Sequence, residues 1–116
     1  MNEQQVIDML ETVLSPLGSC YQEIALSLEK LGIKGYRHRC SLCPIYRYLE
    51  MKIGKEGLQE IAQYRIDNGY GDDEEVSAWY FFLFSHWQKN PCFRQVLNFI
   101  SLFDNGAFHI LNEVSE

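Results

Sequence analysis

Residues 43–54 read CPIYRYLEMKIG, and this stretch predicts a short helix whose two ends are both marked. Proline is favoured in the first turn of a helix, where its missing N–H needs no partner, and glycine is favoured just after the last turn. Pro44 and Gly54 hold these two places. The apolar residues between them recur at three- and four-residue steps, the period of one helix face; they are Ile45, Tyr48, Leu49 and Ile53.

Two more helices are expected before this stretch. Asn2 can cap the first of them, because its side-chain oxygen can accept a hydrogen bond from an unpaired amide of the first turn. The apolar residues of 6–14 follow helical spacing. Ser15 and Pro16 then have the form of a cap followed by a first-turn residue, so a second helix is expected from there to Gly32. A single helix kinked at Pro16 is the alternative.

The segment after Gly54 is ambiguous between helix and strand. Residues 57–66 alternate weakly and fit an edge strand or a helical turn, and residues 67–75 are typical of an exposed acidic turn. The aromatic run at 76–87 favours a strand buried on both faces, with a core helix as the alternative. We expect these two segments to pair as a small β-hairpin.

The C-terminal part predicts a last helix and then the closure of one core. Asn90 and Pro91 start this helix, and Asn105 and Gly106 supply its left-handed cap. A final turn over 107–114 is expected to fold back onto the core. A chain of 116 residues that is 47% hydrophobic can bury one core and is too apolar for a disordered segment. The predicted fold is mainly α (α+β), a compact bundle of four to five helices with a small two-stranded β-hairpin, in a single domain over residues 1–116.

The sequence also bears on cellular location. The first ten residues, MNEQQVIDML, lack the apolar stretch of a signal peptide. The most apolar run, 76–87, has twelve residues, whereas a membrane helix needs about 20. Four cysteines are few for a disulfide scaffold in a chain that can build its own core, which favours reduced thiols. We therefore expect a cytoplasmic protein with no membrane partner.

The charge of the chain is strongly polarised. The formal net charge is −6, yet residues 30–55 carry seven of the ten basic side chains and a single acid, Glu50. This concentration of positive charge favours contact with an anionic group. Unpaired amides at the helix start beside Pro44 add partial positive charge. A solvated helix face that only keeps the protein soluble is the alternative explanation.

The basic loop before Pro44 supplies the candidate binding residues. Arginines hold phosphates or carboxylates through forked N–H donors, and tyrosines can stack on a base. A nucleotide or a single-stranded nucleic acid is therefore an alternative ligand, although the acidic remainder of the chain argues against a broad polynucleotide footprint. We assign anion or partner binding to Lys34, Tyr36, Arg37, His38, Arg39, Ser41 and Arg47.

Two cysteines with two residues between them, Cys40 and Cys43, lie in the same loop. This spacing is typical of thiol-redox pairs and of half a zinc site. A thiol at a helix start is expected to have a lowered pKa and to be more reactive. Packing of both thiols against the core is the alternative. Further zinc ligands would have to come from a scattered set: Cys20, His38, His86, Cys92 and His109.

Two segments resemble a family of small uncharacterised bacterial proteins of actinobacterial type. The first holds Gly32 and Gly35, followed by C-x-x-C-P-I-x-x-Y-L at 40–49, and the second reads FDNGAF at 103–108. That family has no known activity, so the resemblance implies an intracellular bacterial origin and a shared fold but no catalytic residues. It also implies strands in the middle region, in agreement with the expected hairpin.

Together these observations predict a small, soluble, non-enzymatic binding or regulatory module. Residues 34–52 would engage a protein partner or an anionic ligand. Because aromatic residues are favoured in interface cores, a homodimer is a further expectation. No cofactor is expected, and the alternative is a thiol-redox or zinc-binding protein that uses Cys40 and Cys43.

Overall fold

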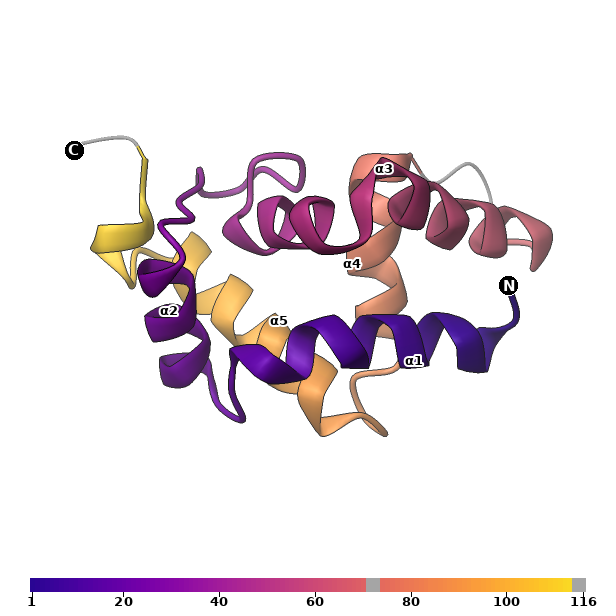
Figure 1. The fold of residues 1–116 in the computed structure, drawn as a ribbon, viewed down its shortest axis with the longest axis horizontal. Coiled ribbons are helices and arrows are strands. Elements are labelled where there is room, and N and C mark those ends of the chain that lie inside the picture. Colours follow the sequence, from indigo (N-terminus) through magenta and orange to yellow (C-terminus); the bar gives the residue numbers. More distant parts are fainter. Residues whose placement is uncertain (71–73, 114–116) are drawn as a thin grey trace.

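Helices α1 and α3 run along the long axis of the molecule, and α4 and α5 lie across them (Figure 1). The computed structural model describes residues 1–70 and 74–113. Its described residues form a compact, mostly helical fold with five α-helices and two short 3-10 helices. The α-helices are α1 (Glu3–Leu14), α2 (Tyr21–Lys30), α3 (Pro44–Asp67), α4 (Glu75–Ser85) and α5 (Pro91–Asp104), and the 3-10 helices are η1 (Ser15–Leu17) and η2 (His109–Leu111).

Helix α1 begins as its sequence predicts. The side chain of Asn2 accepts a hydrogen bond from the amide of Gln5, at 2.9 Å, and the side chain of Gln5 accepts one from the amide of Asn2, also at 2.9 Å. This reciprocal capping box satisfies two amides that the helix leaves unpaired. Val6, Leu10 and Leu14 are buried on one side of the helix, which confirms the predicted apolar face.

Helix α2 begins later than predicted. Ser15 and Pro16 form one 3-10 turn instead of a helix start, and the chain then turns at Gly18, whose φ is 140°. A side chain at Gly18 would collide with the Cβ atom of Glu23, because the two positions are only 2.3 Å apart. Glu23 also accepts hydrogen bonds from the amide and the hydroxyl of Ser19. Both expectations for this segment, a helix from Ser15 and a single kinked helix, are therefore wrong.

Helix α3 starts at Pro44, as predicted, and its first helical segment ends at Gly54, also as predicted, but a second helical segment follows directly. Gly54 has φ 69° and ψ 176°, a conformation that is essentially restricted to glycine. The chain then returns to helical geometry and continues to Asp67. The second half contributes buried side chains at helical spacing, which include Leu58, Ile61 and Ala62. The weak alternation of residues 57–66 therefore belongs to a helix.

The expected β-hairpin is not seen. Residues 76–85 belong to α4. Among the described residues, β-type pairing is limited to one isolated parallel bridge between Gly35 and Asn112. The strand preference of aromatic residues depends on how their side chains pack in the tertiary structure. The side chains on one side of α4 are buried, and they include Trp79 and Phe82. Side chains on the opposite side are exposed. Part of the predicted acidic turn, residues 71–73, lies outside the described residues.

Helix α5 and the turn after it close the core. The side chain of Asn90 accepts a hydrogen bond from the amide of Phe93, and Gly106 takes the left-handed conformation after the last turn. Leu111 is buried, so the final turn folds back as predicted. Phe103 ends the buried face of α5 and lies close to the loop that follows α2. No described helix combines the length and the apolar character that crossing a membrane requires.

Candidate functional site

The basic loop before α3 is held by backbone hydrogen bonds on both sides. Gly35 donates to the carbonyl of Leu111 at 2.9 Å, and its own carbonyl accepts from Glu113 at 3.0 Å. Tyr36 donates to the carbonyl of Leu42 at 2.9 Å, which closes the loop on itself. A side chain at Gly35 would meet that same carbonyl oxygen at 2.3 Å. The loop is therefore a fixed part of the fold that requires glycine at this crossing.

Arg37, one of the predicted binding residues, bonds to the C-terminal end of α5. Its Nε donates to the carbonyl of Phe103 at 2.7 Å and its Nη2 to the carbonyl of Ala107 at 3.2 Å. The guanidinium also lies over the Phe103 ring, 5.2 Å from its centroid. The last carbonyls of a helix have no partners within the helix. Phe103 lies in the last turn of α5 and Ala107 in the segment after it, so Arg37 joins the loop to both and acts as an internal clamp.

Arg47 plays the corresponding role on the other side of the loop. Its Nη1 donates to the carbonyl of Lys34 at 2.9 Å and pairs with Glu113 Oε2 at 2.7 Å. The guanidinium covers the ring of Tyr36 at 5.7 Å from the centroid. The structure therefore does not bring Arg37, Arg39 and Arg47 together as one anion grip. Two of these three arginines hold the loop in place instead.

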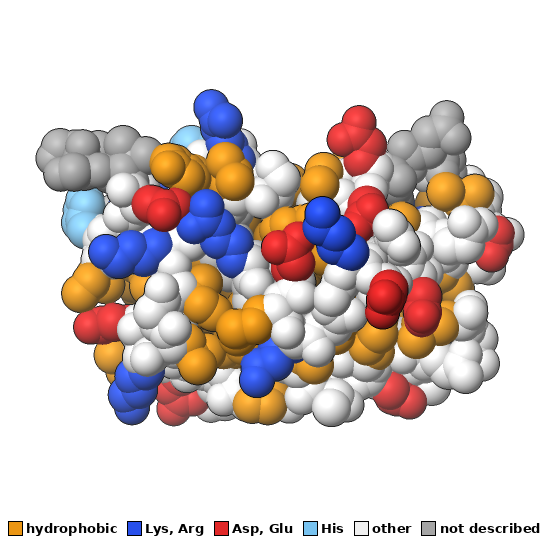
Figure 2. All heavy atoms as spheres, turned by 45° about the horizontal axis from the view of Figure 1, so that its top comes forward, with side chains coloured by type: hydrophobic (Ala, Val, Ile, Leu, Met, Phe, Trp, Pro, Cys, Tyr) orange, Lys and Arg blue, Asp and Glu red, His pale blue; other side chains and the backbone are white. Residues whose placement is uncertain are grey.

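The remaining cations of the segment stay exposed and form what we call the basic face. Two exposed apolar side chains lie in the same segment: Leu31 at 50% and Met51 at 56% exposure. Figure 2 shows Lys and Arg side chains over the left and the middle of the surface, interleaved with apolar side chains. The basic face consists of Lys30, Leu31, Lys34, Arg39, Met51, Lys52 and Lys55.

The two cysteines of the loop differ in burial. Cys43 is the N-cap residue of α3 and is only 4% exposed, whereas Cys40 is exposed. Burial raises the pKa of the Cys43 thiol to about 12 and outweighs the helix amides that favour its thiolate. Partial burial and the charge of Asp104 also raise the pKa of Cys40. The expectation of a lowered thiol pKa is therefore wrong, because loss of hydration exceeds the effect of the helix start.

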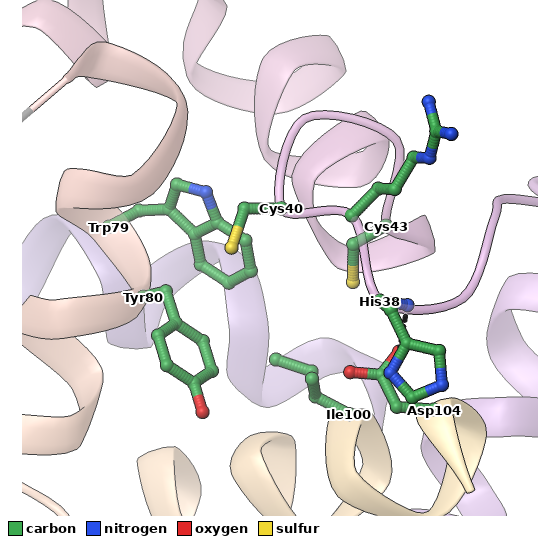
Figure 3. A pocket seen from close by; sticks show the side chains of 8 residues that line it. His38, Cys40, Cys43, Trp79, Tyr80, Ile100 and Asp104 are labelled. Atoms are coloured by element: carbon green, nitrogen blue, oxygen red, sulfur yellow. Dashed lines mark hydrogen bonds between the residues drawn. The ribbon is translucent and has the colours of Figure 1, made fainter.

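Both cysteines line a cavity of about 260 Å³ between the loop, α4 and α5 (Figure 3). The backbone amide of His38, which has a φ of 62°, donates to Asp104 Oδ1 at 2.9 Å and fixes the loop to α5. Sequence reasoning did not assign the far wall of this cavity, because its residues are distant in the chain and carry no shared motif. This wall is formed by Trp79, Tyr80, Ile100 and Asp104.

The other zinc candidates are not assembled around the pair. Among residues 1–70 and 74–113, no three His, Cys, Asp or Glu side chains are grouped so that they could hold one metal ion. Cys20 caps α2 and Cys92 lies in the first turn of α5. His86 stacks on Phe82 with ring centroids 4.4 Å apart. A four-ligand zinc site is therefore not formed by the described side chains.

A second surface carries exposed aromatic residues. Phe81, Phe84 and Trp87 are exposed along α4 and the turn that follows it. Phe84 and Trp87 line a groove of about 380 Å³ together with Leu97 of α5. Interface cores are enriched in aromatic residues, which is the basis for expecting a homodimer. The homodimer itself stays a prediction.

The contrast between the two thiols gives a first testable prediction. At neutral pH we expect iodoacetamide to alkylate Cys40 slowly and to leave Cys43 unmodified until the protein unfolds, because the thiolate is the reactive form. Labelling of Cys40 should speed up about tenfold per pH unit below its pKa. Peptide mapping by mass spectrometry measures both sites. Labelling of native Cys43 at the rate of Cys40 would contradict the burial described above.

Fold and site together define a small helical protein with a fixed basic loop over a thiol-lined cavity. Comparisons with protein-family models, with curated proteins and with solved structures found no match to this chain. The function is therefore argued from the site.

Proposed function

We propose that this protein is a non-enzymatic binding module that recognises an acidic segment of a partner protein through its basic face. The observation that carries the proposal is the exposure of five cations on a segment that internal contacts hold in place, in a chain of net charge −6. The resemblance to small bacterial proteins adds a bacterial cytoplasm as the setting of this proposal.

Contacts within the fold hold Lys34 and Lys52 of the basic face. Arg47 connects Lys34 to α3 through its hydrogen bond to the Lys34 carbonyl. Met51 follows Arg47 by one helical turn, so both lie on the same side of α3. The ammonium of Lys52 lies 5.9 Å from the centroid of the Tyr48 ring. A surface that is ordered before binding loses less conformational entropy when a partner docks.

Charge favours a short acidic protein segment over a nucleic acid. A long polyanion would extend beyond the basic face to the acidic remainder of the chain, which repels it. Within the described part of the basic segment, the tyrosines offer no open platform for base stacking, because Tyr46 and Tyr48 are buried and the Tyr36 ring is covered by Arg47. Exposed Leu31 and Met51 supply the apolar contact that a protein interface combines with a charged rim.

The chemistry of the thiols favours binding over catalysis in this proposal. A nucleophilic cysteine needs a populated thiolate, and the raised pKa values of Cys40 and Cys43 keep both thiols protonated at neutral pH. The raised pKa values also argue against the thiol-redox function that the spacing of Cys40 and Cys43 suggested.

A double charge reversal tests the proposal. Wild-type protein and the Lys34→Glu/Lys52→Glu variant are used as baits in lysate of the source cells, and captured proteins are identified by mass spectrometry. We expect a partner that wild type captures and the variant loses, with capture that weakens as salt rises because exposed charges are screened. The bound segment, mapped by crosslinking, should be acidic.

Lys89→Glu is the matched control, since Lys89 is exposed in the turn after α4 and outside the basic face. This variant should capture the partner as wild type does. Equal capture by the double variant, with an unchanged circular dichroism spectrum, would refute the basic face as the binding surface. Loss of capture after nuclease treatment would instead assign the cations to nucleic acid and overturn the proposal.

A further inference from the structure

The thiols of Cys40 and Cys43 line one cavity. Cys40 comes from the loop and Cys43 is the N-cap residue of α3, and both line the same cavity. Figure 3 shows both sulfur atoms directed into the space above Tyr80 and Ile100. Because Cys40 is exposed, the cavity is open to an ion from solution. Of the residues of the basic face, Arg39 also lines this cavity, whereas Lys34 and Lys52, which test the proposed function, do not.

The loop between the thiols is closed before any ion arrives. The amide of Leu42 donates to the carbonyl of Arg39 at 3.1 Å, which forms a tight turn across Cys40 and Ser41. The carbonyl of Leu42 accepts from Tyr36, and Asp104 holds the amide of His38. These bonds fix the backbone of the turn at both ends, so an ion would have to order only the two cysteine side chains.

The number of ligands decides which ion this cavity fits. Structural zinc needs four protein ligands, and within the described ranges no third His, Cys, Asp or Glu completes a group with the two thiols. Thiolates are soft ligands that select soft cations, among which Cu(I) is stable with two sulfur ligands in a near-linear arrangement. We infer that Cys40 and Cys43 form a two-coordinate site for a soft monovalent cation, Cu(I).

The charges around the cavity agree with such an ion. Two thiolates and Cu(I) carry one net negative charge, which the partial positive charge at the start of α3 stabilises. The carboxylate of Asp104 lines the same cavity and attracts an entering cation. On binding, two S–H bonds break, two Cu–S bonds form, and two protons pass to water. Copper keeps its oxidation state, so no oxidant or reductant takes part.

The experiment is a competition for Cu(I) between the full, reduced chain and the chelator bicinchoninate under anaerobic conditions. We expect wild type to remove one Cu(I) per chain from the chelator. Cys40→Ser should weaken apparent affinity by more than about 100-fold, since even the loss of a residue that only orients a ligand costs 10–100-fold. Cys40 is exposed, so this variant is expected to keep its fold. Cys43→Ala, checked by circular dichroism, should lose the ion as well.

Cys20→Ser and Cys92→Ser are matched controls. Each of these cysteines also lies at a helix start, Cys20 at α2 and Cys92 at α5, without a second cysteine within four residues. Both variants should bind Cu(I) as wild type does, and X-ray absorption should show two sulfur neighbours. The inference is overturned if wild type fails to compete with the chelator, if Cys40→Ser binds equally, or if Zn(II) is held by the pair with four ligands.

Discussion

Replacing Phe99 by alanine is expected to lower the free energy of unfolding by about 3–5 kcal/mol, the largest effect among our predictions. Phe99 is fully buried in α5 and stacks on Phe103 and Phe108, with ring centroids 6.1 Å and 5.3 Å apart. The substitution removes both contacts and leaves a cavity where α5 meets the C-terminal turn. Urea unfolding followed by circular dichroism measures the change.

Phe84→Ala is the control of the same chemistry. Phe84 lies on α4 and is 57% exposed, so truncation should change stability by no more than about 0.5–1 kcal/mol. A loss at Phe99 as small as that at Phe84 would mean that α5 does not pack as described. A large loss at Phe84 would show that its exposed ring is covered in solution, as the expected homodimer would require.

The second large effect is expected at Arg37. Arg37→Ala should destabilise the protein by about 2–3 kcal/mol, because it deprives the carbonyls of Phe103 and Ala107 of a charged donor. The guanidinium contact over the Phe103 ring is lost as well. Thermal and urea unfolding of the purified variant measure this change. Arg37→Lys should recover only part of the loss, since an ammonium cannot reproduce the forked contacts.

Arg39→Ala supplies the comparison, because Arg39 lies two residues further along the same loop and is exposed. Its effect on stability should stay within about 0.5 kcal/mol. For partner capture we expect the reverse order. Arg39→Ala should weaken capture because Arg39 belongs to the basic face, whereas Arg37→Ala should affect capture only by destabilising the fold. A stable Arg37→Ala protein that loses its partner would return Arg37 to the binding role that the sequence predicted for it.

The position of the candidate site could be predicted from the sequence, whereas the roles of its residues could not. The concentration of charge in 30–55 and the spacing of Cys40 and Cys43 pointed to the loop that lines the cavity. Which arginines face solvent depends on acceptors far along the chain; Arg37 and Phe103 are 66 positions apart. Tyr80 and Asp104, on the opposite wall of the cavity, could not be predicted either, because they are also distant from the loop in the sequence.

The middle of the chain shows the same limit for the fold. The buried positions of 57–66 include a glycine, a small alanine and the charged Arg65, so hydrophobicity alone shows the helical period of this segment only weakly. The aromatic run of α4 has apolar residues on every side, so its sequence alone does not distinguish a strand buried on both faces from a helix buried on one. Packing of α4 against α3 and α5 selects the helix.

By itself, the sequence determined where several helices begin or end. The cap at Asn2, the proline at Pro44, the cap at Asn90 and the glycine at Gly106 act within one turn of the backbone, so neighbouring residues suffice to predict them. Only the tertiary structure decided the continuation of α3, the helical state of α4, the internal bonds of the arginines and the direction in which the cysteine pKa values shift. Each of these depends on burial and on partners that folding brings together from distant parts of the chain.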